Sequence, residues 1–213
     1  MRAYDEIYLD DAMNNLGDML DYAVNDCGYS GDEFFTYFIF SGVASSFEIG
    51  NPKYVAGLSG PEIASEVIYR TYRTRLSTPV SEGYDKTAEY WAGWALAYYQ
   101  WHSSRRFADM RRNGLTIERM LELYPTLHEA DISKFIAVAD HIINTNYASG
   151  PVNLQRIRKE NGLTQKALAE KSGVSLRMIQ LYEQRKKEIN KAQAISVSRL
   201  ARALYCDITD LLE

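Results

Sequence analysis

The stretch LTQKALAEKSGVSLRMIQLYE, residues 163–183, decides the fold of the C-terminal third of this chain. It holds two short apolar patterns with the letters SGVS between them. Leu168 and Ala169 share one face of the first pattern, and Ile179 and Tyr182 share one face of the second. The spacing predicts two short helices joined by a tight turn.

The residues at the ends of these two patterns support the same prediction. Thr164 and Ser175 each stand directly before a pattern, and both residue types cap helix N-termini with a side-chain oxygen. Gly173 tolerates the left-handed backbone that a sharp turn between helices needs. Val174, the next residue, can then point back into the core, as in a helix-turn-helix unit.

Three further helical patterns flank this pair. Leu154 and Ile157 mark one before it, which ends at Asn161-Gly162. A fourth helix is expected over about 191–204, and a final turn, DITDLL, closes the core at residues 207–212. The region therefore reads as five short helices around one small core.

A unit of about sixty residues built this way resembles the Cro/repressor-type helix-turn-helix family, also called the xenobiotic-response-element family. The resemblance is carried by residues 163–183 and by LARALYCDITDLL, residues 200–212. Lys166 and Ala167 depart from it, since the family is often acidic there, and QRKKEINK replaces the glycine that commonly follows the position of Glu183. The resemblance implies double-stranded DNA as partner and a homodimer on paired half-sites.

The second helix of the pair, residues 175–183, carries side chains suited to reading bases. With Ile179 and Tyr182 inward, Arg177 and Gln180 face outward; Arg can bind guanine and Gln adenine, while an exposed leucine can touch a thymine methyl. The alternative is that this face of the helix is only exposed to solvent and does not bind DNA. We predict that this helix lies in the major groove and that DNA is contacted by Thr164, Gln165, Lys166, Ser175, Leu176, Arg177, Gln180, Leu181, Arg185, Lys186 and Lys187.

Charge divides the chain in two. Residues 1–149 hold 12 Lys and Arg against 21 Asp and Glu, whereas residues 150–213 hold 12 against 7. The sign changes at NTNYASGPVN, residues 144–153, whose Asn, Ser, Gly and Pro are typical of a linker. We predict an acidic helical domain over 1–143, a linker over 144–153 and a DNA-binding domain over 154–213.

The acidic part reads as helical as well, and because no long alternating apolar-polar run occurs anywhere, the whole chain is predicted to be all-α. In the fourth helix, Trp91, Trp94, Tyr98 and Trp101 form one stripe, which we expect to belong to the core and not to a ligand cage. The expected N-terminal helices cover about 5–27, 32–47, 61–76, 86–107, 116–123 and 128–143.

Three hypotheses describe what residues 1–143 do. They bind a protein, as an antitoxin binds its toxin; they enclose a small-molecule effector among the aromatic helices; or they are an enzyme with a regulatory DNA-binding tail. The last is weakest, because His102, His128 and His141 show no metal-binding spacing and no nucleophile or nucleotide motif occurs. We therefore expect a transcriptional regulator, most simply a repressor, and neither an enzyme nor a cofactor-binding protein.

The remaining composition suits a cytoplasmic protein. Cys27 and Cys206 lie far apart without metal-ligand or disulfide spacing, which fits a reducing compartment. The N-terminus is acidic where a secretory signal would be basic, and the longest apolar run, residues 34–47, is too short to span a bilayer. No membrane partner is expected.

Overall fold

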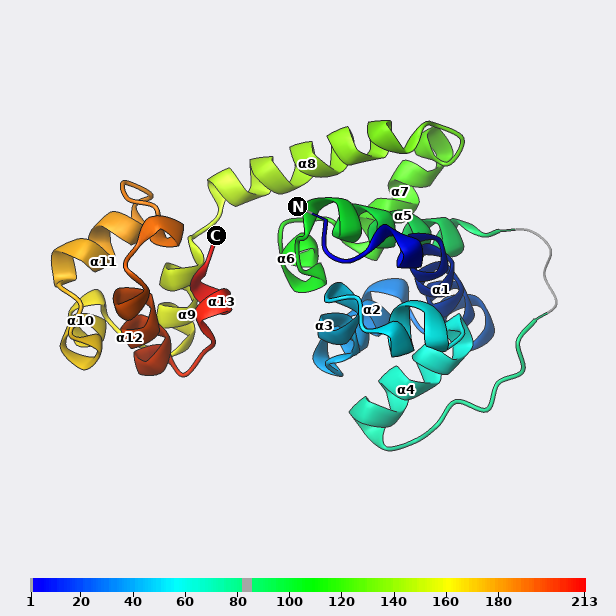
Figure 1. The fold of residues 1–213 in the computed structure, drawn as a ribbon, viewed down its shortest axis with the longest axis horizontal. Helices are drawn as coiled ribbons and strands as arrows, with labels where there is room; N and C mark the ends of the chain where they lie inside the picture. Colours follow the sequence, from blue (N-terminus) through cyan, green and yellow to red (C-terminus); the bar gives the residue numbers. More distant parts are fainter. Residues whose placement is uncertain (1, 82–85) are drawn as a thin grey trace. The chain divides into compact units, whose positions relative to one another are not determined.

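The computed structural model describes residues 2–81 and 86–213. This part of the chain folds into helices joined by turns and loops, and it contains no strand (Figure 1). The all-α prediction is thus confirmed for the described chain. It forms two compact units, residues 1–146 and 147–213. Among the helices that are described, none combines the length and apolar character that crossing a membrane requires.

Unit 1, residues 1–146, is built from eight α-helices in its described part, the last of which runs on into unit 2. A short 3-10 helix precedes the first, and π-helical turns follow α1 and α3. The bounds are α1 Leu9–Asp21, α2 Gly31–Phe40, α3 Val43–Glu48, α4 Gly60–Tyr72, α5 Ala88–Ser103, α6 Phe107–Arg112, α7 Ile117–Leu127 and α8 Ile132–Ser149.

Two glycines allow α1 and α5 to pack closely. A Cβ atom on Gly93 would lie 2.3 Å from the carbonyl oxygen of Leu16, and one on Gly17 would lie 2.9 Å from the ring of Tyr90. Real side chains do not approach so closely, so alanine at either position would push the helices apart. This contact fixes where α5 presents its aromatic residues.

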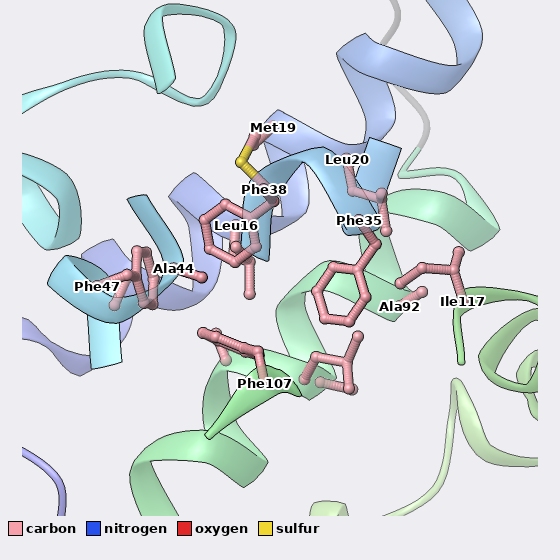
Figure 2. Close-up of a cluster of buried hydrophobic side chains, with 14 of the residues drawn as sticks. Leu16, Met19, Leu20, Phe35, Phe38, Ala44, Phe47, Ala92, Phe107 and Ile117 are labelled. Carbon is pink, nitrogen blue, oxygen red and sulfur yellow. The ribbon is translucent and has the colours of Figure 1, made fainter. Parts of the chain in front are cut away.

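Phenylalanines from α2, α3 and α6 fill the centre of the unit 1 core (Figure 2). The ring of Phe107 lies 5.3 Å from that of Phe38, 5.8 Å from that of Phe35 and 5.9 Å from that of Phe47, in edge-on arrangements. Such pairs add stabilisation beyond their burial. The nearly all-apolar segment after residue 32 is therefore largely explained by the core, although Phe40 is exposed.

The aromatic stripe of α5 belongs mainly to the core, as expected. Trp91 and Trp101 are buried, while Trp94 and Tyr98 are half-buried and pack against the core from outside. The Trp101 indole nitrogen donates to the carbonyl oxygen of Tyr4 at 2.9 Å.

Several predicted element boundaries in unit 1 are wrong. The helices expected over 61–76 and 86–107 end at Tyr72 and Ser103, because the residue after each takes a left-handed φ, and a separate helix, α6, follows the second. The helix expected over 32–47 is two helices, α2 and α3, because Gly42 adopts a left-handed φ of 76° between them. The helix expected to end at residue 123 continues to Leu127, with Pro125 inside its last turn. Because proline has no N–H, it removes the hydrogen bond that position 125 would make to the Leu121 carbonyl oxygen, and the helix ends two residues later.

The predicted linker is also shorter than its composition suggests. Residues 144–149 continue α8, and only Gly150 to Val152 separate this helix from the next. Asn and Thr cost a helix only a few tenths of a kcal/mol each, so they do not end one. Asn146, near the end of α8, donates to the carbonyl oxygen of Asn113 at 3.0 Å, while Gly150-Pro151 stops the helix.

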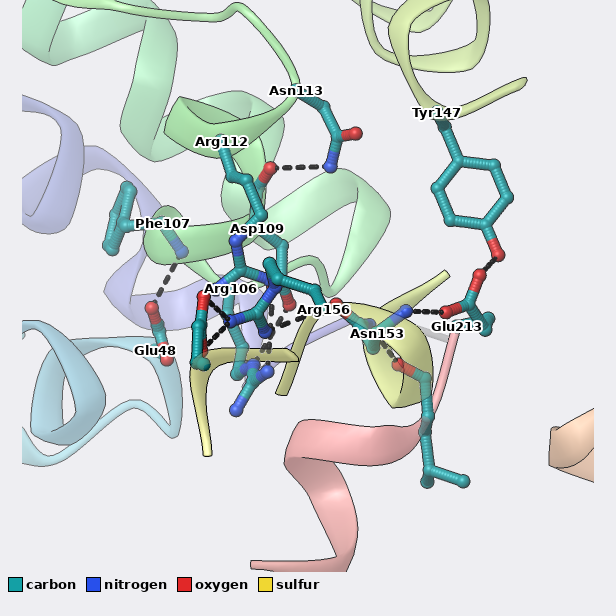
Figure 3. A network of polar contacts seen from close by, with 12 residues as sticks. Glu48, Arg106, Phe107, Asp109, Arg112, Asn113, Tyr147, Asn153, Arg156 and Glu213 are labelled. Atoms are coloured by element: carbon teal, nitrogen blue, oxygen red, sulfur yellow. Dashed lines mark hydrogen bonds and ion pairs between the residues drawn. The ribbon is translucent and has the colours of Figure 1, made fainter. Parts of the chain in front are cut away.

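A buried carboxyl group makes the stability of unit 1 depend on pH. Glu48 Oε1 accepts the backbone N–H of Phe107 at 2.7 Å, at the start of α6 (Figure 3). Burial raises the pKa of Glu48 from 4.5 to about 7, against the opposing effects of the Phe107 hydrogen bond and of the Arg106 charge. Because this folded-state pKa lies above the unfolded one, the stability contribution is full below pH 4.5 and is lost as the pH rises through about 7.

Replacing Glu48 with glutamine should therefore stabilise unit 1 only at high pH. Glutamine keeps an acceptor for the Phe107 N–H but cannot ionise, so we expect a gain of about 1–3 kcal/mol near pH 8 and none near pH 4. Urea unfolding followed by tryptophan fluorescence measures this, since all three tryptophans lie in unit 1. An equal effect at both pH values would contradict the assignment.

Unit 2, residues 147–213, confirms the five expected helices around one small core (Figure 1). Leu168, Ile179, Leu200 and Leu211 are fully buried at its centre. A 3-10 helix at Ile189–Lys191 precedes the fourth helix. The bounds are α9 Asn153–Glu160, α10 Gln165–Ser172, α11 Leu176–Glu183, α12 Ala194–Leu204 and α13 Ile208–Leu211.

Candidate nucleic-acid interface

The turn between α10 and α11 has the predicted caps. The Thr164 hydroxyl accepts the Ala167 N–H at 3.0 Å, and the Ser175 hydroxyl accepts the Met178 N–H at 3.3 Å. Gly173 takes a left-handed φ of 68° and ends α10. Local chemistry thus stabilises the turn and the start of α11.

Ser172 adds a contact that sequence reasoning did not assign. Its buried hydroxyl donates to the carbonyl oxygen of Leu168 at 2.6 Å and accepts the Val174 N–H at 3.2 Å. Both ends of the turn are thereby tied to one side chain, and Val174 is buried as predicted.

The two faces of α11 separate as the helical period predicts. Ile179 and Tyr182 are buried, with 0% and 4% of their surface exposed. On the other face, Leu176 is 37% exposed and Arg177 is exposed. The predicted contact residues Gln180 and Leu181 are half-buried on this helix.

A buried ion pair fixes α11 from behind. The Arg158 guanidinium on α9 donates to both carboxylate oxygens of Glu183, at 2.6 and 2.8 Å, and to the Leu163 carbonyl oxygen at 2.6 Å. Only 9% and 1% of the two charged side chains are exposed. Bidentate geometry of this kind sets orientation as well as energy, so the pair fixes the rotation of α11 in unit 2.

The same carboxylate also holds a residue that we predicted to bind phosphate. The Gln165 side-chain amide donates to Glu183 Oε2 at 2.7 Å and is half-buried. Its neighbours Thr164 and Lys166 are exposed. One amide hydrogen of Gln165 is still available for a phosphate, now in a fixed position.

Arg185 lies in the loop that follows α11, and its backbone is unusual for a residue other than glycine. It adopts a left-handed φ of 52°. Its guanidinium donates to the carbonyl oxygens of Gly150 and Tyr147, at 2.8 and 2.7 Å, and lies 4.7 Å from the centre of the Tyr147 ring. The predicted phosphate contact of Arg185 therefore competes with a structural one at the end of α8.

The C-terminus completes this corner of unit 2. Glu213 accepts hydrogen bonds from the Tyr147 hydroxyl and from the Asn153 N–H, and it lies 3.9 Å from Arg185 (Figure 3). Asn190 ties the loop after α11 to the same residue through two hydrogen bonds. The loop that carries the basic cluster is thus anchored at both ends.

Four of the predicted cations have no such role. Lys166, Arg177, Lys186 and Lys187 are exposed, and within the part of the chain that the structure describes none of them forms an ion pair. Their charge is open to an anionic partner, as phosphate contacts require.

Alanine and glycine at position 185 should differ in stability. Arg185→Ala loses the hydrogen bonds and keeps the left-handed backbone, so we expect unit 2 to lose about 1–2 kcal/mol. Arg185→Gly loses the same bonds but relieves the backbone, and should be more stable than the alanine variant by about 1 kcal/mol. Thermal unfolding followed by far-ultraviolet circular dichroism compares them, and equal stability of all three proteins would refute this role.

Comparison with known proteins agrees with this geometry for unit 2. Residues 154–211 match a family model described as helix-turn-helix. The searches of curated proteins and of solved structures gave no match to the chain. The C-terminal unit is therefore a helix-turn-helix domain of the Cro/C1 type, and the protein is a DNA-binding transcription regulator.

Proposed function

We propose that the protein is a repressor that binds a specific operator as a homodimer, with α11 in the major groove. The observation that carries the proposal is the outward face of α11, where Arg177 and Gln180 lie opposite the buried Ile179 and Tyr182. Ser172 and the Arg158–Glu183 pair hold this face rigid, so its side chains need little reorganisation on binding.

The chemistry of this face suits direct reading of bases. Arg177 can donate two hydrogen bonds to guanine O6 and N7, and Gln180 can pair with adenine N6 and N7. Leu176 is an apolar side chain left partly exposed at the first turn of α11, where a thymine methyl group would cover it. Lys186 and Lys187 supply phosphate contacts that fix the register.

We infer a dimer because one helix-turn-helix domain reads too few base pairs to be specific, and repression because it is the simplest outcome of operator binding. A single helix reads only a few base pairs, so useful specificity needs two half-sites about one helical turn apart. Repression requires only that the operator be occupied, whereas activation needs a further contact with the transcription machinery.

In this proposal, unit 1 controls the DNA binding of unit 2. Residues 1–149 carry a formal charge of −9, which repels a duplex and favours a basic protein partner. An antitoxin that pairs with a basic toxin is one form that this control would take.

The test is fluorescence anisotropy with labelled duplexes from the region upstream of the protein's own coding sequence. Each is compared with a shuffled duplex of equal length at two salt concentrations, because affinity without its salt dependence is uninterpretable. Selective binding that persists at the higher salt supports the proposal. Equal binding to both duplexes at both salts would refute specific reading.

The basic cluster should act on affinity without changing selectivity. Lys186→Ala combined with Lys187→Ala removes two phosphate contacts, so we expect similar losses on operator and shuffled duplexes. The slope of log affinity against log salt should become shallower by about 2. Arg185→Ala, which alters the adjacent residue, should leave the slope nearly unchanged, and a reversed pattern would reassign the phosphate contacts.

A further inference from the structure

A pocket of about 330 Å³ opens on unit 1 between the start of α5 and the end of α7. It is lined by Lys86, Tyr90, Trp91, Trp94, Tyr124 and His128. Four of these six residues are aromatic, and a lysine and a histidine supply nitrogen donors. We propose that this pocket binds a small planar aromatic anion, such as a one- or two-ring aromatic carboxylate.

The aromatic walls are held in place by one another. The Trp91 ring meets the Tyr124 ring edge-on at 5.7 Å, and the Tyr124 ring stacks on the His128 ring at 4.5 Å. His128 Nδ1 lies 2.8 Å from the carbonyl oxygen of Tyr124, which fixes the imidazole at the end of α7. A planar ligand would thus meet preformed ring surfaces, which lowers the entropy lost on binding.

Lys86 gives the pocket its preference for an anion. Its Nζ donates to the Tyr90 hydroxyl at 2.6 Å, and that hydroxyl donates to Asn14 Oδ1 at 2.6 Å. An ammonium group has three hydrogens, so two remain for a ligand. Among the described residues, no carboxylate forms an ion pair with Lys86, although its charge opposes the rise that burial causes in the pKa of Asp18.

The other charged group at the pocket does not reverse this preference. Glu129 lies 3.6 Å from His128 Nε2, but its side chain is 88% exposed and is screened by solvent. A cationic ligand would gain from the aromatic faces but would meet the Lys86 ammonium, with which no described carboxylate forms an ion pair. An aromatic anion can stack its ring on these faces and place its carboxylate against the ammonium group.

The volume limits the size of the ligand. Pockets for small molecules span about 300–1,000 Å³, and this one lies at the small end of that range. This volume matches a ligand of one or two fused rings. The binding step concerns unit 1 alone and does not depend on the proposed function of unit 2.

The three tryptophans of the protein provide the test. Trp91 and Trp94 line the pocket, whereas the Trp101 indole is hydrogen-bonded to Tyr4 away from it. Proton–nitrogen correlation spectra give one indole signal for each tryptophan, assigned with Trp94→Phe and Trp101→Phe. The probes are salicylate, neutral phenol and the cation trimethylphenylammonium.

Salicylate should shift the Trp91 and Trp94 signals saturably, with a dissociation constant between about 10 µM and 1 mM, and leave Trp101 unchanged. Lys86→Gln should weaken salicylate about tenfold and phenol less than about twofold, since only the anion uses the ammonium group. The matched control is Lys53→Gln, which also removes a lysine that lies over a tyrosine ring, Tyr54, outside the pocket. It should bind all probes as the unaltered protein does.

Several results would overturn the proposal. These are the absence of saturable shifts with salicylate up to about 10 mM, equal shifts of all three indoles, tighter binding of the cation than of salicylate, or salicylate binding that Lys86→Gln leaves unchanged. Because none of these readouts involves DNA, the result stands whether or not α11 reads an operator.

Discussion

Replacing both Arg177 and Gln180 with alanine should lower the affinity for the operator duplex by about 2–6 kcal/mol, at about 1–3 kcal/mol for each base-reading side chain. This corresponds to a loss of roughly 30-fold to 10⁴-fold. Neither side chain is buried in the unit 2 core, so the fold has no reason to change. The measurement is anisotropy on operator and shuffled duplexes.

The pattern across duplexes separates base reading from simple charge attraction. Affinity for the shuffled duplex should fall much less, because only the charge of Arg177 contributes there. Arg202→Ala, an exposed cation in the last turn of α12, is the matched control and should retain selectivity. If the double variant and the unaltered protein bound every duplex equally and weakly, α11 would not be a recognition helix.

The parts of unit 2 that could be predicted from the sequence are those set by local chemistry. Thr164 and Ser175 cap the helices that follow them, and Gly173 takes the left-handed turn between. These features depend on residues at most four positions apart. The inward face of α11 follows from the helical period alone.

The contacts that hold the site from a distance could not be predicted in this way. Arg158 and Glu183 lie 25 positions apart, and no periodicity links an arginine on one amphipathic helix to a glutamate on another. Arg185 looked like one more member of a basic cluster. Only the path of the chain brings Tyr147 and Gly150 to its guanidinium.

Unit 1 shows the same division between local and distant effects. Its helices follow from apolar spacing, but the break at Gly42 could not be predicted from the sequence, because glycine is also tolerated within helices. The pocket joins Trp94 of α5 to Tyr124 of α7 and to His128, which follows α7, and their distance along the sequence conceals it. The aromatic residues of α5 thus contribute both to the core and to the wall of the pocket.

Replacing Arg158 with methionine should destabilise unit 2 by about 3–5 kcal/mol while unit 1 remains unaffected. The change leaves Glu183, with 1% of its side chain exposed, as a buried charge without its partner. Removing one member of a buried pair costs about 3–5 kcal/mol. A unit of this size has roughly 3–10 kcal/mol of stability in total, so little would remain.

Two spectroscopic signals separate the two units. All three tryptophans lie in unit 1, so their fluorescence should show an unchanged unfolding transition. Far-ultraviolet circular dichroism reports helices of both units and should show a second, earlier transition for Arg158→Met. If the fluorescence and circular dichroism of Arg158→Met instead changed in one common, earlier transition, the two units would unfold cooperatively.

The double variant Arg158→Met/Glu183→Leu distinguishes the energy of the pair from its geometry. Removing both charges avoids the unpaired carboxylate, so stability should recover to within about 1–2 kcal/mol of the unaltered protein. Gln165 would lose its acceptor on Glu183, however, and α11 would lose the bidentate contact that fixes its rotation. We therefore expect the double variant to be folded but less selective for the operator, since positions of base-reading side chains depend on that rotation. Full recovery of both stability and selectivity would mean that the apolar core alone orients α11.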